Sequence, residues 1–221
     1  SQPIPAGIVN TGVILTDRAP ADITWTGATD SAWDLQKSVN WTNTSSQTDV
    51  FFTGDTLVFD DTATNTNVEL AGTFSPASIT LTTSQIYSFN GGAISGSGGL
   101  VKNGTGPLLL GSAMNLTGNV IVNAGALRIS NAAAWPSASL LVTVKSGAII
   151  DVSDLPTAVV TTGKTFAGAG ALTGNLTVNG THDPGVGSTV SGTLAYGAAS
   201  RVSWSLSASI NAAGASDTVT A

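Results

Sequence analysis

Residues 99–130 read Gly-Leu-Val-Lys-Asn-Gly-Thr-Gly-Pro-Leu-Leu-Leu-Gly-Ser-Ala-Met-Asn-Leu-Thr-Gly-Asn-Val-Ile-Val-Asn-Ala-Gly-Ala-Leu-Arg-Ile-Ser. Three short runs of strand-forming residues lie in this stretch, at 108–110, 120–122 and 127–129, and Gly, Asn, Thr and Pro separate them. Short apolar runs bounded by turn residues predict β-strands. Their regular spacing favours strands wound into successive coils over strands paired in hairpins.

The composition excludes several classes of protein. Charged residues make up only 9% of the chain, against ~25% in a typical globular domain, which is unusual for a cytosolic enzyme and common in secreted bacterial β-proteins. The net charge of −6 provides no basic footprint, so we expect no nucleic-acid partner. The absence of cysteine excludes disulfides and thiolate metal sites. No apolar run approaches the ~18 residues of a membrane span.

Residues 1–23 are expected to form an extended N-terminal arm, because Pro3 and Pro5 disfavour a helix. Two interpretations remain open for its apolar residues. They form the first strand or a cap of the coil, or they add as a strand to a neighbouring subunit. The candidate intersubunit residues are Ile4, Ile8, Val9, Val13, Ile14 and Leu15.

Residues 24–61 form a Trp-rich module in which Trp25, Trp33 and Trp41 are spaced eight residues apart. A strand over 56–60 would present Leu57 and Phe59 to one face. We expect a compact cap over the end of the coil, since the last rung of a solenoid otherwise exposes both core and backbone. The alternative is a platform on which the three indole rings stack against sugars.

Residues 62–221 are expected to form the β-solenoid itself. The sequence Leu-Thr-Gly-Asn-Val-Ile-Val-Asn at 116–123 is echoed by Leu-Thr-Gly-Asn-Leu-Thr-Val-Asn at 172–179, a separation of 56 residues that suggests three coils of roughly 19 residues. Asn90-Gly91-Gly92 predicts a turn, and residues 131–135 predict one short helical turn before Pro136. The fold class is therefore all-β, a parallel β-helix, with a β-sandwich as the alternative.

The stretch Gly-Gly-Leu-Val-Lys-Asn-Gly-Thr-Gly-Pro-Leu-Leu-Leu-Gly at 98–111, with Val-Ile-Val-Asn-Ala-Gly-Ala-Leu-Arg at 120–128, resembles the autotransporter-associated β-strand repeat of secreted bacterial proteins. Residues 167–185 are similar to the segment that often follows that repeat, and the Trp-rich module ending in Gly-Asp-Thr-Leu-Val-Phe-Asp-Asp resembles the opening of such proteins. The resemblance implies a right-handed parallel β-helix, export to the cell surface, and structural or adhesive roles. It implies no catalytic residues.

Candidate catalytic groups are sparse. Glycoside hydrolysis needs two carboxylates across one bond, and the candidates are Asp60 with Asp61 and Asp151 with Asp154. Adjacent residues of a strand point to opposite faces, so the first pair does not converge, and the second flanks a turn. His182, the single histidine, is expected in a turn. We therefore predict no enzymatic activity, no cofactor and no metal site.

Two functions remain as hypotheses. The first is a small secreted structural subunit whose open sheet edges pair head to tail into an extracellular filament or sheath, with the chain itself as partner. The second is a monomeric surface adhesin or carbohydrate-binding module that binds a surface polysaccharide through the three tryptophans. Both place the chain outside the cell or on its surface, after removal of a signal peptide.

Overall fold

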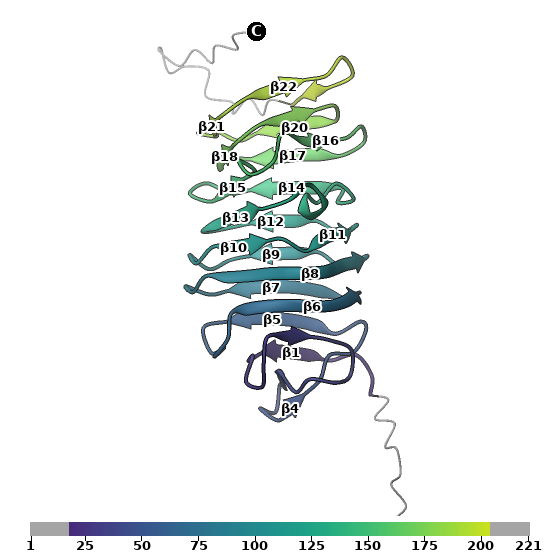
Figure 1. The fold of residues 1–221 in the computed structure, drawn as a ribbon. Helices are drawn as coiled ribbons and strands as arrows, with labels where there is room; N and C mark the ends of the chain where they lie inside the picture. Colours follow the sequence, from purple (N-terminus) through teal and green to yellow (C-terminus); the bar gives the residue numbers. More distant parts are fainter. Residues whose placement is uncertain (1–17, 204–221) are drawn as a thin grey trace, which may run out of the picture.

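The computed structural model describes residues 18–203, and these form a parallel β-solenoid of about seven coils. Successive coils stack along one axis, from β4 at one end to β22 at the other (Figure 1). With ~4.8 Å between neighbouring strands, seven coils extend roughly 34 Å. The solenoid prediction is confirmed, and the β-sandwich alternative is wrong, because almost every strand pairs in parallel with the equivalent strand of the next coil. The candidate arm residues between Ile4 and Leu15 lie outside the described residues.

Three sheets form the walls of the solenoid. Sheet A comprises, in spatial order, β4 (Thr48–Asp49), β3 (Trp41–Asn43), β1 (Asp22–Trp25), β5 (Thr56–Asp60), β7 (Ser78–Thr82), β9 (Leu100–Lys102), β12 (Val120–Val122), β14 (Leu141–Val144), β17 (Thr165–Gly168), β20 (Thr181–Pro184) and β23 (Arg201–Val202). Sheet B comprises β2 (Ala32–Trp33), β6 (Asn67–Phe74), β8 (Tyr87–Gly96), β10 (Leu108–Leu110), β13 (Ala126–Ile129), β15 (Ile149–Asp151), β18 (Ala171–Thr173) and β21 (Thr189–Ser191). Sheet C comprises β16 (Ala158–Val160), β19 (Leu176–Val178) and β22 (Leu194–Tyr196).

The third wall is interrupted in the middle of the solenoid. Strand β11 (Ala113–Leu116) pairs with the second half of β8, and the next coil has the 3₁₀ helix η1 (Ala132–Ala134) after β13, where the sequence predicted a helical turn. The loop that follows η1 bonds to both flanking strands. Ser139 donates its hydroxyl to the carbonyl of Leu116 in β11, and Trp135 Nε1 donates to the carbonyl of Val159 in β16, at 3.0 and 2.8 Å. Side chains thus satisfy edge carbonyls at the break.

The core consists of columns of inward-facing residues, to which each strand of a stack contributes. Side chains alternate along each strand, so the residues next to an inward column face outward. In sheet A this outward column is largely Thr, Val and Ile. Each fully buried aliphatic or aromatic side chain contributes about 1.5–3 kcal/mol. The inward column of sheet A runs Ile23, Leu57, Ile79, Leu100, Val120, Val142, Phe166 and His182, and the outward column runs Thr24, Val58, Thr80, Val101, Ile121, Thr143, Ala167 and Asp183.

Aromatic side chains close the N-terminal end of the core. Strands β1 and β2, which belong to the Trp-rich module, already pair in parallel with β5 and β6 of the following coil. The antiparallel hairpin β3–β4 then covers the free edge of β1. The cluster beneath this hairpin contains Trp25, Trp33, Trp41, Phe51, Phe59, Phe74 and Phe89.

A partly buried ion pair fastens the start of the described chain to this cap. Arg18 binds Asp55 through two parallel contacts, Nη1–Oδ1 at 2.7 Å and Nη2–Oδ2 at 2.8 Å, and its guanidinium lies 4.5 Å from the centroid of the Phe52 ring. The fully buried Asp55 carboxylate also accepts the backbone N–H groups of Ala21 and Phe52. The hydrogen bonds to Asp55 raise the pKa of Arg18 above its ordinary value. One carboxylate therefore joins three segments of the cap.

The predicted turn at residues 90–92 is wrong, because β8 runs through it without reversing. Gly91 has φ +75°, and Gly92 approaches the neighbouring coil so closely that an added Cβ would lie 1.9 Å from the carbonyl oxygen of Gly72. The pairing of β6 with β8 shifts register at this point, between Leu70 and Thr73. The glycines therefore allow a bend and a close contact between two strands rather than a hairpin.

Coil length also differs from the prediction of roughly 19 residues. Paired inward residues of sheet A lie 24 positions apart from Val142 to Phe166 and 16 apart from Phe166 to His182. As a result, the two echoed sequences occupy different walls: Val120 lies in β12 of sheet A, whereas Leu176 lies in β19 of sheet C. The echo identifies a strand motif and does not measure a whole number of coils.

Candidate functional site

The three tryptophans proposed as a sugar platform are part of the core. Trp25 and Trp33 are 0% exposed and Trp41 is 1% exposed. Trp41 lies edge-to-face against both others, with ring centroids 5.0 Å from Trp25 and 5.7 Å from Trp33, and Trp33 stacks on Phe74 at 5.4 Å. No indole face is free for a pyranose ring. The carbohydrate-stacking hypothesis is therefore wrong for these residues, while the interpretation as a cap agrees with the structure.

The candidate catalytic carboxylates are held in structural hydrogen bonds. Asp60 accepts the backbone N–H and hydroxyl of Thr62, and Asp61 accepts the hydroxyl of Thr83 in the next coil. Asp154 forms a two-pronged ion pair with Arg128, with both N–O distances at 2.9 Å. This pairing lowers the pKa of Asp154 below its ordinary value. Among residues 18–203 no group of three His, Cys, Asp or Glu side chains is arranged to hold a metal ion.

His182 lies in strand β20 and not in a turn. Its side chain faces the core between Phe166 and Val202, and it is nearly buried. Its Nδ1 and the hydroxyl of Tyr196 share a hydrogen bond of 2.5 Å, whose donor depends on the imidazole tautomer. Burial lowers the pKa of His182 below its ordinary value, so the neutral form is favoured. The histidine stabilises the penultimate coil as a polar core residue.

Lys102 is a second polar residue inside the core. It occupies an inward position of β9 and is fully buried. Its ammonium donates to the backbone carbonyls of Gly104 and Ala124, at the corner between sheets A and B. Desolvation lowers its pKa below the ordinary value. The lysine closes the corner of the solenoid and has no access to a ligand.

A hollow lies on the outer face of sheet A, across β14, β17 and β20. Its volume is about 390 Å³, within the range of small-ligand sites. Leu141, Thr143, Thr165 and Ala167 form its floor because they occupy outward positions of the strands. The turn 184–188 forms one side and carries Val186, which is 93% exposed.

A second hollow of about 250 Å³ lies beside it, where sheet C turns into sheet A. Its walls are formed by the turns at 162–163, 179–180 and 197–201, and they include Asn179 and Arg201. Thr165 lines the first hollow and pairs with Thr181, which lines the second, so the two hollows are neighbours on sheet A. The two neighbouring hollows on the outer face of the C-terminal coils are together called the depression.

The charges in this depression differ from those of the rest of the chain. Lys145 lines the first hollow and Arg201 the second, and within residues 18–203 neither forms an ion pair. Asp183, which lines the first hollow, is the only acidic residue between positions 155 and 203. A protein with net charge −6 therefore carries a locally basic, hydroxyl-rich surface here.

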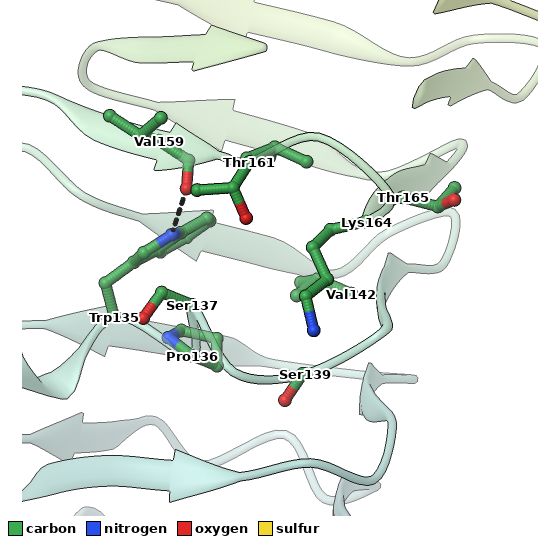
Figure 2. A pocket seen from close by; sticks show the side chains of 10 residues that line it. Trp135, Pro136, Ser137, Ser139, Val142, Val159, Thr161, Lys164 and Thr165 are labelled. Atoms are coloured by element: carbon green, nitrogen blue, oxygen red, sulfur yellow. Dashed lines mark hydrogen bonds between the residues drawn. The ribbon is translucent and has the colours of Figure 1, made fainter. Parts of the chain in front are cut away.

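A third cavity, beside the break in the third wall, is too small for a ligand. Figure 2 shows Trp135 and Lys164 on opposite sides of this space, which has a volume of about 10 Å³, enough for one water molecule at most. Lys164 Nζ donates to the carbonyl of Ala138 at 2.7 Å, and Trp135 donates to Val159. The residues around it are engaged in holding the interrupted wall together.

The sequence did not reveal the depression on sheet A. Its residues come from three coils and become neighbours only through the strand register, which local patterning does not give. The available signal was the alternation of small polar residues at outward positions of 165–183 together with Lys145 and Arg201.

The two ends of the solenoid differ, and the difference bears on filament growth. The hairpin β3–β4 occupies the place where a preceding coil would add to β1, and its edge strand β4 has only two residues. A short edge strand, and a hairpin that covers the edge of a sheet, both hinder pairing with a strand of another chain. At the other end, core-facing residues of the last described coil remain exposed: Val190, Tyr196 and Val202. Head-to-tail growth by edge pairing is not supported.

Comparison with known proteins gives one relative. The chain is 33% identical over 129 residues to the adhesin BmaC autotransporter of Brucella suis biovar 1, a match that covers 58% of this chain and 4% of the adhesin. The chain thus spans a small part of that protein's length. No family model matches the chain, and no solved structure matches it. The β-solenoid and this similarity both agree with the resemblance to autotransporter-associated repeats.

Proposed function

We propose that this chain is part of a bacterial surface adhesin, in which the β-solenoid forms a rigid shaft and one outer face contacts another surface. The observation that carries the proposal is the similarity to an autotransporter adhesin over 129 residues in a chain whose core is a continuous solenoid. A shaft with fixed coil spacing holds an outer face in place without any moving part.

The role that we propose is non-enzymatic. Asp60, Asp61 and Asp154 each hold a turn or an ion pair, and His182 faces the core. These groups do not converge on one hollow. The depression on sheet A offers hydroxyls, an amide and opposite charges, which suit recognition of a polar partner such as a polysaccharide. We place the chain outside the cell or on its surface. No helix among the described residues is long and apolar enough to cross a membrane.

Adhesion of coated particles tests the proposal. Beads carrying the purified chain should adhere to cultured epithelial cells or to polysaccharide-coated plates at least several-fold more than beads carrying albumin. Beads coated with the heat-unfolded chain serve as the matched control, since adhesion through the folded face is lost on unfolding. Equal retention of all three kinds of bead would contradict an adhesive role, and turnover of a polysaccharide would contradict the non-enzymatic one.

A further inference from the structure

The depression on the outer face of sheet A has features of a binding site for a charged carbohydrate. It spans three coils, and its floor consists of side chains fixed by strand pairing: Leu141, Thr143, Thr165, Ala167 and Thr181. A surface held in register in this way is preorganised, so binding would cost little ordering of the protein. Threonine hydroxyls and the Asn179 amide match the hydrogen-bonding groups of sugars.

The basic residues of the chain identify the charge of the partner. Of the seven Lys and Arg residues, Arg18 and Arg128 are ion-paired and Lys102 is buried. Lys145 and Arg201, by contrast, are exposed at the two ends of the depression. Arg201 lies in the same column as Leu141, three coils further along the axis of the solenoid. Lys145 lies four residues after Leu141 along the chain. Strand spacing and rise place the two positions roughly 20 Å apart on the diagonal.

We propose that this depression binds an acidic polysaccharide, a glycan chain with carboxylates that Lys145 and Arg201 contact while the threonines and Asn179 bind its hydroxyls. This inference rests on the proposed adhesive function and specifies its ligand class. An extended glycan follows the depression from one cation to the other. Asp183 lies in the first hollow and opposes part of this attraction, so it should reduce the affinity for a carboxylate-bearing glycan.

Titration calorimetry at low salt, with oligogalacturonate and a neutral malto-oligosaccharide of equal length as probes, tests the ligand class. The chain should bind the acidic probe and not the neutral one, and binding should weaken at high salt because these charges are exposed. The double variant Lys145→Gln/Arg201→Gln should lose about tenfold or more in affinity, because it removes both charge-assisted contacts to the carboxylates. Asp183→Asn should bind more tightly.

The matched control is Lys37→Gln/Arg128→Gln, which removes the same charge from positions outside the depression and should keep the affinity of the unmodified chain. Circular dichroism of each variant verifies the fold. Equal affinities of the two double variants, or equal binding of both sugars, would overturn the inference. Binding of polyglutamate as tightly as oligogalacturonate would also overturn it, because the surface would then recognise charge and not a glycan.

The outcomes separate this inference from the adhesive function. Bead adhesion by a chain that shows no selective oligogalacturonate binding in the calorimeter would support an adhesin that uses another face, and would refute the glycan site. Selective oligogalacturonate binding without any bead adhesion would support the site and refute the adhesive function.

Discussion

Replacement of Asp55 by alanine is the sharpest test of how the cap is held. The carboxylate is fully buried and accepts four hydrogen bonds, two from Arg18 and one each from the backbone N–H groups of Ala21 and Phe52. Asp55→Ala leaves both amides without a partner, at about 1–3 kcal/mol each. Arg18 is 24% exposed and can turn towards water, so the loss of its ion pair adds less to the destabilisation than the two unpaired amides do. We expect a loss of about 3–5 kcal/mol, the range for breaking a buried pair.

Asp55→Asn and a surface control refine the expectation. The asparagine keeps one acceptor oxygen, so about half of the loss, roughly 2 kcal/mol, should remain. Asp22→Ala is the matched control, because Asp22 lies exposed on β1 and its side chain makes no hydrogen bond within the described residues. This control should change stability by less than about 0.5 kcal/mol.

Urea unfolding followed by tryptophan fluorescence is the suitable measurement, since Trp25, Trp33 and Trp41 report on the cap. Each unit of a solenoid contacts only its neighbours, so the cap can unfold separately from the other coils. The urea midpoint of the fluorescence change should therefore fall, and the midpoint of the far-ultraviolet circular dichroism change, which reports on the remaining coils, should fall less. A loss below 1 kcal/mol for Asp55→Ala, or a loss equal to that of Asp22→Ala, would refute the account of Asp55 as the residue that joins the cap.

Three further predictions concern the shaft. Gly104→Ala places a Cβ 1.9 Å from the carbonyl oxygen of Thr83 and should destabilise by more than about 2 kcal/mol in urea, whereas Gly72→Ala, whose nearest neighbour is 3.4 Å away, should cost under about 1 kcal/mol. Trp33→Ala leaves a cavity where the buried indole ring packs and should lower the free energy of unfolding by about 3–5 kcal/mol. An unaltered melting curve would contradict the place of Trp33 in the core. His182 has a folded pKa below its ordinary 6.5, so the unfolded chain binds more protons and stability falls as the pH drops from about 7 through 6.5 towards the folded pKa. His182→Phe should abolish this dependence between pH 7 and 5, and persistence of the slope would exclude the single histidine as its source.

Much of the inward half of the shaft could be predicted from sequence. The strand expected at 56–60 is β5 with the same bounds, and both Leu57 and Phe59 are buried. The runs at 108–110 and 120–122 are β10 and β12. These predictions succeed because alternation of apolar residues reports directly on which side chains face the core.

Predictions failed where a residue's role depends on the neighbouring coil. The sequence at Gly91 and Gly92 predicted a turn, yet in the structure their lack of a side chain lets the backbone of β6 approach closely. His182 read as a turn residue beside Asp183 and Pro184, yet its register with Phe166 sends it inward. The spaced tryptophans left a sugar platform open as the alternative to a cap, and the structure buries all three. Each case requires the pairing partner, which no local pattern supplies.

The division of the strands into inward and outward columns also explains why a binding face can arise on this fold. Core stability resides in the inward columns, such as Leu100, Val120 and Val142, so outward positions can change without loss of stability. Lys145 and Arg201 are both exposed, and the backbone hydrogen bonds of β14 and β23 do not involve their side chains. Recognition and folding are therefore carried by alternate residues of the same strands. A shaft of this kind can acquire a ligand preference on any coil while its neighbours continue to stack.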